Sequence, residues 1–240
     1  MRGITKYIVS IIVPALNEEK NLKDAVDHIV EAAGNRQDYE ILIFNDGSTD
    51  ETGRIADDLA GYNPNIKVIH HQSSQNLGGC FREGVALAQG EYAVMLPGDD
   101  ETDSRTIANL FNALGSADIV ATYTVNKEAR NWKRRLVSAT YTFLINFLFN
   151  LRLKYFNGPS LIKVELLKKL PPISSGFAYM SEILVRLIKA GYPYKEIEMY
   201  IKPSHGRISR AFKLKNVKQV GQTILKLFID VYFRRKTLYV

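Results

Sequence analysis

Short apolar runs alternate with amphipathic segments through the first half of the chain, and this alternation is the strongest constraint on its fold. Each apolar run has the length of a buried strand, and each amphipathic segment has helical spacing. The predicted strands occupy residues 8–14, 39–44, 67–70, 92–96 and 118–123. The predicted helices between them occupy residues 18–33, 50–59, 81–88 and 104–114. The pattern predicts an α/β fold with a mostly parallel, Rossmann-like sheet flanked by helices.

The alternation ends after residue 124. A charged connector follows at residues 126–135, and then an apolar segment at 136–151. The last segment, residues 215–239, has apolar residues at amphipathic helical spacing with basic residues around them. We therefore expect one domain with two halves, residues 1–124 and 125–240, the second ending in amphipathic helices.

The two halves carry opposite charge. Residues 1–126 contain 9 Lys and Arg and 19 Asp and Glu, whereas residues 127–240 contain 23 Lys and Arg and 6 Asp and Glu. A basic half of this kind suits a polyanionic partner, either nucleic acid, an acidic lipid surface or a phosphorylated substrate. We expect no nucleic-acid partner, because the basic half has no known RNA-binding or DNA-binding motif and its charge flanks apolar helices.

The apolar segment at residues 136–151 is too short to span a membrane, which takes about 20 apolar residues. Basic residues flank it on both sides, among them Arg134 and Arg152. Such a helix can lie in the headgroup region of a membrane, and it can equally be a buried core helix. A membrane surface is therefore one expected partner, and both interpretations stay open at this stage.

The single cysteine, Cys80, cannot form an intramolecular disulfide. The first residues lack the apolar region of a secretory signal. We expect a cytoplasmic protein that is peripheral on the inner face of the membrane, and an integral membrane partner protein is a further expectation.

Polar residues follow several predicted strands, where ligands of open parallel sheets bind. Glu18 follows the first strand and Asp46 the second, and either carboxylate could accept hydrogen bonds from a ribose or a base. Judged alone, Asn17 could simply cap a helix, and Gly78 could belong to an ordinary turn instead of letting the backbone approach a ligand. The convergence of these residues on one sheet edge favours a binding site.

An acidic run follows the strand at residues 92–96. Its members Asp99, Asp100, Glu101 and Asp103 repel one another unless a cation lies between them. Carboxylate oxygens are suitable ligands for Mg²⁺ or Mn²⁺, which would bridge a diphosphate. The alternative is a solvated acidic turn.

The motifs PALNEE, FNDGSTDET, NLGGCFREGVALAQGEY and MLPGDDE together resemble the donor half of family 2 glycosyltransferases over about residues 8–124. The resemblance implies a GT-A fold and inverting transfer from a nucleotide sugar, with residues 1–124 as the donor-binding half and 125–240 as the acceptor and membrane half. It implies a donor site made of Pro14, Ala15, Asn17, Glu18, Asp46, Gly47, Asn76, Gly78 and Asp99.

This sequence departs from the family's Asp-x-Asp metal motif, because the first Asp falls on Pro97. Asp99 then takes the second position, and Glu101 falls where relatives can carry another ligand. The two residues can also be read as a shifted Asp-x-Glu. The resemblance implies that Asp99 and Glu101 bind the metal and that Asp100 belongs to the same catalytic motif.

The second half resembles the polyprenyl-phosphate sugar transferases through NGPSLIKVELLKKL, SEILVRLIKAGYPYKEIEM and the HGRISR loop. The relatives' loop ends in Lys where this chain has Arg210, and their earlier Arg falls near Ser204. The resemblance implies a polyprenyl-phosphate or other lipid-linked acceptor. The candidates for its phosphate clamp are Arg134, Ser138, His205, Arg207, Ser209 and Arg210.

The acceptor decides whether a base is needed. A lipid phosphate is already ionised at neutral pH, so cations need only hold it in line with the anomeric carbon. A sugar hydroxyl would need a base, and Glu182 is the best candidate, although it can also be an ordinary acid at a helix start. A third alternative is a non-catalytic nucleotide-binding membrane scaffold, suggested by Pro97.

Overall fold

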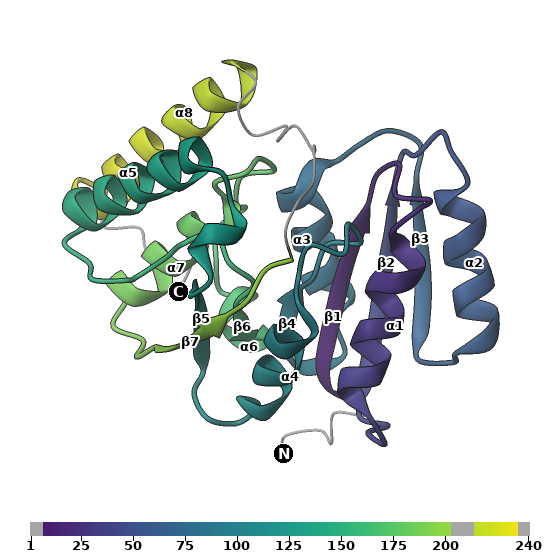
Figure 1. Cartoon of the computed structure of the whole chain (residues 1–240). Coiled ribbons are helices and arrows are strands. Elements are labelled where there is room, and N and C mark those ends of the chain that lie inside the picture. The colour runs from purple at the N-terminus through teal and green to yellow at the C-terminus, as the bar shows by residue number, and fades with distance from the viewer. Residues whose placement is uncertain (1–6, 203–213, 235–240) are drawn as a thin grey trace.

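The computed structural model describes residues 7–202 and 214–234, which form a seven-stranded sheet with helices on both faces (Figure 1). The order across the sheet is β3-β2-β1-β4-β6-β5-β7. The strands are β1 (Tyr7–Ala15), β2 (Tyr39–Asp46), β3 (Ile66–His71), β4 (Gly90–Met95), β5 (Ile119–Thr124), β6 (Leu161–Lys163) and β7 (Lys195–Met199). Only β6 pairs antiparallel with its neighbours among these strands, so the predicted mostly parallel α/β fold is confirmed.

The helices cover the two faces in two groups. One core contains residues of α1, α2 and α4, and the other contains residues of α3 and α5 to α8. The helices are α1 (Leu22–Ala33), α2 (Thr52–Tyr62), α3 (Asn76–Leu87), α4 (Ser104–Asn112), α5 (Trp132–Phe149), α6 (Val164–Leu167), α7 (Tyr179–Lys189) and α8 (Leu214–Tyr232), with a short 3-10 helix η1 (Lys127–Ala129).

The central strand β1 shows why the first half folds this way. Its neighbours β2 and β4 pair with it on both sides, so an uninterrupted apolar run can be buried on both faces. Ile11 packs in the core beneath α1, whereas Ile12 packs in the core beneath α3. Because all three strands are parallel, their carboxyl ends meet at one edge of the sheet.

The strand β6 was not predicted. It has three residues and lies between β4 and β5, where Ala93 pairs with Ile162 and Val120 with Leu161. A strand this short has no detectable alternation, and its position depends on partners distant in the sequence. Through β6 and β7, residues beyond 124 complete the same sheet that the first half begins.

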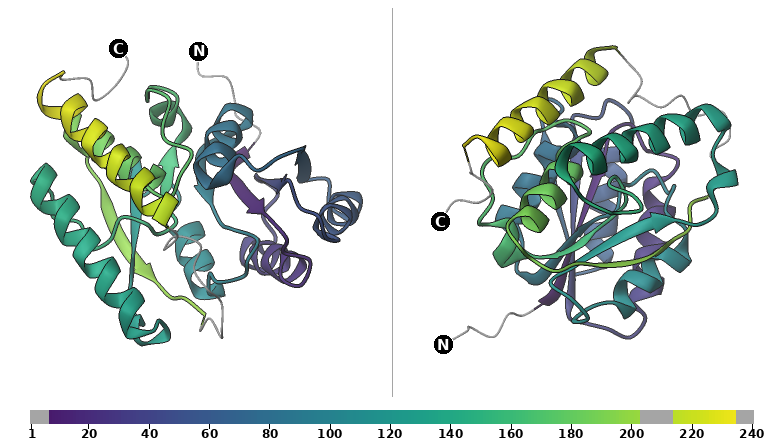
Figure 2. Two further views of the ribbon diagram at one scale, coloured as in Figure 1. Left: turned by 90° about the horizontal axis from the view of Figure 1, so that it is seen from above. Right: turned by 90° about the vertical axis from the view of Figure 1, so that its left-hand side faces the viewer.

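The apolar segment of the second half forms most of α5, which lies beside α8 at one end of the molecule, with α1 and α2 at the other (Figures 1 and 2). The Phe149 ring of α5 is 6.1 Å from that of Phe228 and 6.3 Å from that of Tyr232 on α8. Within residues 7–202 and 214–234, no helix is both long and apolar enough to cross a membrane.

A buried ion cluster joins α7 to α8. Arg186 lies in the core, and its guanidinium donates to Glu182 at 3.0 Å and to Asp230 at 2.9 Å. Glu182 also accepts a hydrogen bond from the Ser174 amide at 2.9 Å. The cluster therefore connects the last described helix to the loop before α7.

Replacing Arg186 should destabilise the protein strongly. In Arg186→Met the buried Glu182 loses its cation and Asp230 keeps only its longer contact with Arg234, at 3.4 Å, so we expect the free energy of unfolding to fall by about 3–5 kcal/mol. Urea denaturation would measure this, with Lys189→Met on the same helix as the control. A loss below about 1 kcal/mol, the range of an exposed pair, would contradict the role of the cluster.

Candidate functional site

A cavity of about 420 Å³ lies at the carboxyl edge of the sheet. Its walls come from the ends of β1 and β2, the loop after β4, the start of α3 and the first turn of α5. The lining contains eight of the predicted site residues, namely Pro14, Ala15, Glu18, Asp46, Asn76, Asp99, Glu101 and Arg134. The structure thus gathers most of the predicted donor residues, both predicted metal ligands and one acceptor residue around one space.

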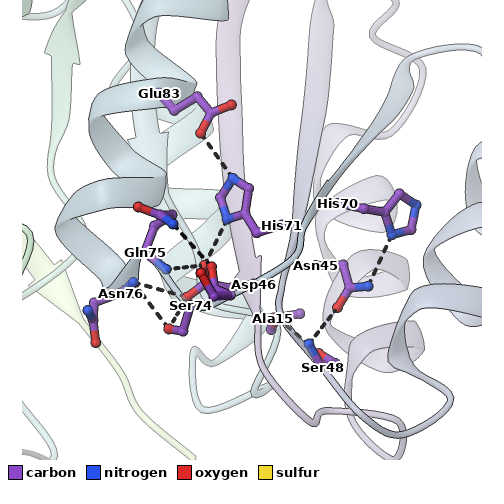
Figure 3. Close-up of polar contacts among 11 residues, drawn as sticks. Ala15, Asn45, Asp46, Ser48, His70, His71, Ser74, Gln75, Asn76 and Glu83 are labelled. Atoms are coloured by element: carbon purple, nitrogen blue, oxygen red, sulfur yellow. Dashed lines mark hydrogen bonds and ion pairs between the residues drawn. The ribbon is translucent and has the colours of Figure 1, made fainter.

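Asp46 accepts four hydrogen bonds at the end of β2 (Figure 3). Oδ1 accepts from His71 Nδ1 at 2.8 Å and from the Gln75 amide at 2.7 Å. Oδ2 accepts from Ser74 Oγ at 2.6 Å and from the Asn76 amide at 3.1 Å. A carboxylate has about four lone-pair sites, so these donors use its whole capacity. Asp46 therefore fixes the N-terminus of α3 and the end of β3.

The protonation states of Asp46 and His71 depend on each other. Burial alone would raise the pKa of Asp46, but its hydrogen bonds from Ser74, Gln75 and His71 outweigh burial, so the pKa lies below its ordinary value. Burial would lower the pKa of His71, but its hydrogen bonds to Asp46 and Glu83 outweigh burial and raise it. His71 Nε2 lies 3.0 Å from a Glu83 oxygen. An imidazolium between two carboxylates is the arrangement that these shifts favour.

Glu18 and Asn17 occupy different positions after β1. Glu18 is buried in the cavity wall, where its amide donates to Thr52 Oγ1 at 2.8 Å. Asn17 has a φ of 57° and accepts from the Thr49 amide at 2.9 Å through its side chain. Asn17 thus joins the loop after β1 to the loop after β2, and it is not part of the cavity lining.

The two predicted donor-site glycines approach the protein's own backbone. Gly47 has a φ of +77°, and a Cβ there would lie 3.0 Å from the Ser74 amide nitrogen. At Gly78 a Cβ would lie 2.1 Å from the Ser174 carbonyl oxygen, and the Gly78 amide donates to the Ser175 carbonyl at 3.0 Å. Gly78 therefore lets α3 contact residues 174–175 closely, and neither glycine lines the cavity.

The acidic run after β4 divides instead of converging on one cation. Asp100 has a φ of 54°, and its carboxylate lies 2.6 Å from Lys202 Nζ and 3.0 Å from His28 Nδ1. Asp103 caps α4 by accepting from the Arg105 amide at 3.0 Å. Asp99 and Glu101 alone of the run line the cavity. Separate partners thus relieve part of the charge repulsion within the acidic run. The sequence alone had predicted that a metal relieves it.

Asp99 and Glu101 fit a divalent metal that also binds phosphate oxygens. Mg²⁺ is usually held by one or two carboxylates together with water and substrate phosphates, and this cavity supplies two carboxylates beside open space. A cation is also close, because Arg134 Nη2 lies 3.9 Å from Glu101 Oε2. The donor set therefore suits the predicted Mg²⁺ or Mn²⁺.

Among the described residues, one group of three potential ligands has its ligand atoms within 4.8 Å of one another, and it consists of Asp46, His71 and Cys80. Its chemistry does not fit. Burial and the neighbouring Asp46 raise the pKa of the Cys80 thiol, so it stays protonated, and the Asp46 and His71 atoms already form hydrogen bonds. This group acts as a hydrogen-bonded support for α3.

The remaining predicted residues lie elsewhere. Ser138, one helical turn after Arg134, lines a different cavity beneath α5. Glu182 is buried in the ion cluster with both oxygens bonded, and it does not line the carboxyl-edge cavity. His205, Arg207, Ser209 and Arg210 lie outside the described residues. The chain enters that segment from Lys202, whose amide donates to the Glu101 carbonyl at 3.0 Å.

Sequence reasoning missed the residues that support Asp46. His71 is not among the predicted site residues, yet it bonds to Asp46 and Glu83. Ser74 and Phe177 line the cavity without having been predicted. The only available signal was the position of His71 at the end of a predicted strand.

The stability contributed by His71 should depend on pH. The folded pKa lies above the unfolded value of about 6.5, so its contribution is complete below about pH 6.5 and is lost as pH rises through the folded pKa. We expect the difference in free energy of unfolding between wild type and His71→Gln to shrink over that rise. Denaturation at several pH values measures it, and NMR titration of Glu83→Gln should show a lower His71 pKa. A pH-independent difference would contradict the paired imidazolium.

Comparisons with known proteins agree on one family. The model of the family described as Glycosyl transferase family 2 matches residues 10–184. Among relatives, the polyprenol monophosphomannose synthase of Mycolicibacterium smegmatis is 27% identical over 201 residues, which cover 78% of this chain and 74% of that protein. The uncharacterized glycosyltransferase EpsJ of Bacillus subtilis is 35% identical over 103 residues, 43% of this chain and 29% of that protein.

Glycosyltransferase GlyG of Streptococcus pneumoniae is 29% identical over 111 residues, 46% of this chain and 36% of that protein. This chain thus spans about a third of the length of GlyG and EpsJ. Among solved structures, glucosyl-3-phosphoglycerate synthase from Mycobacterium tuberculosis, in complex with Mn²⁺, UDP-glucose and phosphoglyceric acid, superposes with a TM-score of 0.70 at 17% identity. The match covers 92% of this chain and 80% of that one, which shows a shared fold.

Proposed function

Because this chain belongs to glycosyl transferase family 2, we propose that it is an inverting glycosyltransferase that moves a sugar from a nucleotide-sugar donor to a polyprenyl-phosphate acceptor at a membrane surface. The observation that carries the proposal is the carboxyl-edge cavity, which Asp99 and Glu101 line together with the buried Asp46 and with Arg134, 3.9 Å from Glu101. A nucleoside diphosphate with its metal needs the carboxylates, and a lipid phosphate needs the cation.

The nucleoside would bind between the end of β1 and the start of α3. Glu18 and Asp46 line this part of the cavity. Since Asp46 already accepts four hydrogen bonds, a direct contact with a base or ribose requires one donor to leave. Ser74 is the natural one, because its hydroxyl can rotate and it also lines the cavity.

Asp99 and Glu101 would hold Mg²⁺ or Mn²⁺ against the diphosphate. When bound, such an ion stabilises the negative charge that develops on the departing nucleoside diphosphate. Two complexes of a structural neighbour, the glucosyl-3-phosphoglycerate synthase of Mycobacterium tuberculosis, support this role, since they contain Mg²⁺ or Mn²⁺ with UDP. Arg134, close to Glu101, would keep an acceptor anion near the same carboxylate pair.

The acceptor is proposed to be a lipid phosphate because Arg134 lines the cavity, whereas Glu182, the predicted base, does not. The nucleophilic phosphate oxygen is ionised at neutral pH, so Arg134 needs only to position it. The segment with His205, Arg207, Ser209 and Arg210 begins next to Lys202, which bonds to Asp100 and to the Glu101 backbone. The resemblance to a polyprenol monophosphomannose synthase also supports this acceptor.

Transfer to a sugar hydroxyl would need a base. Glu182 was the candidate, but its carboxylate is buried and is bonded to Arg186 and to the Ser174 amide. These contacts favour the lipid phosphate over the hydroxyl. A non-catalytic scaffold is disfavoured by the cavity itself, where Asp99 and Glu101 remain together despite Pro97.

Removing the acidic pair should abolish metal-dependent donor binding. In Asp99→Asn and in Glu101→Gln we expect Mn²⁺-dependent affinity for the correct nucleoside diphosphate to fall by at least roughly tenfold, because a charged metal ligand is lost. Calorimetry with UDP and GDP, with and without Mn²⁺, measures it. Glu91→Gln, at the other end of β4, is the matched control.

The acceptor is tested separately, by incubating the protein with radiolabelled nucleotide sugars, Mg²⁺ or Mn²⁺, and undecaprenyl or dolichyl phosphate. With wild type and with Glu91→Gln, label should enter the organic phase. With Asp99→Asn, label should stay out of the organic phase. Metal-dependent donor binding without any label in the organic phase would overturn the lipid-phosphate acceptor and leave the donor site standing.

We propose further that α5 and α8 lie on the membrane, on its inner face. Phe143 and Phe147 on α5 are 70% and 73% exposed, and their rings stack at 6.2 Å. Leu225 and Phe233 are exposed on and just after α8. Exposed aromatic and aliphatic side chains beside basic residues are typical of helices that lie in the membrane interface. An integral membrane partner protein could cover the same surface.

The double variant Phe143→Ser/Phe147→Ser should bind vesicles at least roughly tenfold more weakly, since two large apolar side chains no longer enter the acyl boundary. Co-sedimentation with vesicles that contain phosphatidylglycerol measures it. Tyr62→Ser/Leu87→Ser, which removes two exposed apolar side chains elsewhere, should bind as wild type does. Equal binding by both double variants would exclude α5 as the membrane contact.

A further inference from the structure

A polar cavity of about 630 Å³ lies between the end of β3 and α3, and we call it the β3–α3 cavity. It shares no lining residue with the carboxyl-edge cavity. Its lining includes His71, Gln75 and Glu83, whereas Asp46 lines the carboxyl-edge cavity. The hydrogen bonds of Asp46 therefore connect two separate cavities.

The two oxygens of Asp46 have partners in different cavities (Figure 3). Oδ1 accepts from His71 and from the Gln75 amide, and both of these residues line the β3–α3 cavity. Oδ2 accepts from Ser74 and from the Asn76 amide, and both of these residues line the carboxyl-edge cavity. A ligand in the carboxyl-edge cavity would thus meet the Oδ2 side of the carboxylate while Oδ1 stays held.

His71 makes both of its contacts only as an imidazolium. Its side chain is 10% exposed, with Nδ1 2.8 Å from Asp46 Oδ1 and Nε2 3.0 Å from Glu83 Oε2. A neutral imidazole has one N–H, so one ring nitrogen would turn a lone pair toward a carboxylate. Loss of the proton therefore breaks one of the two contacts and leaves two carboxylates without their shared cation.

The other titratable side chains near His71 are engaged elsewhere or uncharged. Three belong to the lining of the β3–α3 cavity or lie beside Asp46, namely His70, Arg82 and Cys80. The Arg82 guanidinium donates to a backbone carbonyl at 3.2 Å, and His70 Nε2 lies 3.1 Å from an Asp57 oxygen. Burial raises the pKa of the Cys80 thiol, so it stays uncharged. Among the described residues, Asp46 and Glu83 are thus the two charged groups in direct contact with His71.

We propose that His71 is a positioning residue for the nucleotide donor: its imidazolium, held by Glu83, keeps the Asp46 carboxylate turned so that Oδ2 meets the nucleoside. The inference rests on the proposed donor site and extends it to a residue that does not line the donor cavity. An imidazolium also offsets the charge of Asp46 beside an anionic donor. Donor affinity should therefore fall as pH rises through the pKa of His71.

Nucleotide affinity tests this in the whole chain. Calorimetry with UDP and with GDP, each with Mn²⁺, is carried out at several pH values from about pH 6 upward. At about pH 6, His71→Gln should bind the preferred nucleotide at least roughly fivefold more weakly than wild type, because a charge-assisted hydrogen bond is lost. The difference should shrink as pH rises. The matched control His70→Gln changes a histidine of the same cavity that bonds to Asn45 and Asp57, and it should stay within about twofold of wild type.

NMR titration of wild type gives a readout that a purely structural role would not change. If the donor binds better to the protonated form, bound nucleotide must raise the pKa of His71, because the coupling is reciprocal. Glu83→Gln, at a side chain that is 44% exposed, should move the pH profile of donor affinity to lower pH.

The outcomes separate the inference from the proposed function. Failure of wild type to bind either nucleotide would overturn both. If wild type binds a nucleotide, the role of His71 alone is overturned when His71→Gln binds equally well at about pH 6, or when the pKa of His71 is the same with and without nucleotide.

Discussion

The carboxylate of Asp46 holds one wall of the site together, because it joins the end of β2 to the connection between β3 and α3 through four hydrogen bonds. His71 brings the end of β3 to it, and the amides of Gln75 and Asn76 bring the N-terminus of α3. A negative charge at this position also suits the positive end of the helix dipole. The wall of the carboxyl-edge cavity therefore depends on one buried ionised group, whose hydrogen bonds outweigh the cost of burying its charge.

The opposite charges of the two halves acquire a physical meaning in the fold. The acidic half supplies Asp99 and Glu101 to the carboxyl edge, and the basic half returns to that edge through Arg134. The strand β5 runs parallel to β4, because both pair antiparallel with β6, so the chain leaves β5 at the carboxyl edge ten residues before Arg134. The residues that the proposed function assigns to a diphosphate and to an acceptor anion thus lie at one edge of one sheet.

Local patterns were enough to predict the parallel strands and most of the cavity. Glu18, Asp46 and Asp99 each follow a buried apolar run, and parallel pairing then brings them to one edge. Patterns failed where long-range contacts decide. Glu182 has the sequence context of a base, yet it is buried in a cluster with Arg186 and Asp230. Asp230 lies 48 residues further along the chain than Glu182.

Asp100 is the last case of this kind, and it explains how the acidic run tolerates its own charge. In the sequence it is one of three consecutive acids, but its positive φ turns it away from Asp99 and Glu101 toward Lys202 and His28. A residue with left-handed backbone is strained unless its surroundings hold it, and here two partners do. The same carboxylate ties the acidic run to Lys202, whose amide also donates to the Glu101 carbonyl, so the position of Glu101 at the cavity is supported by contacts that leave Asp99 and Glu101 themselves facing the space.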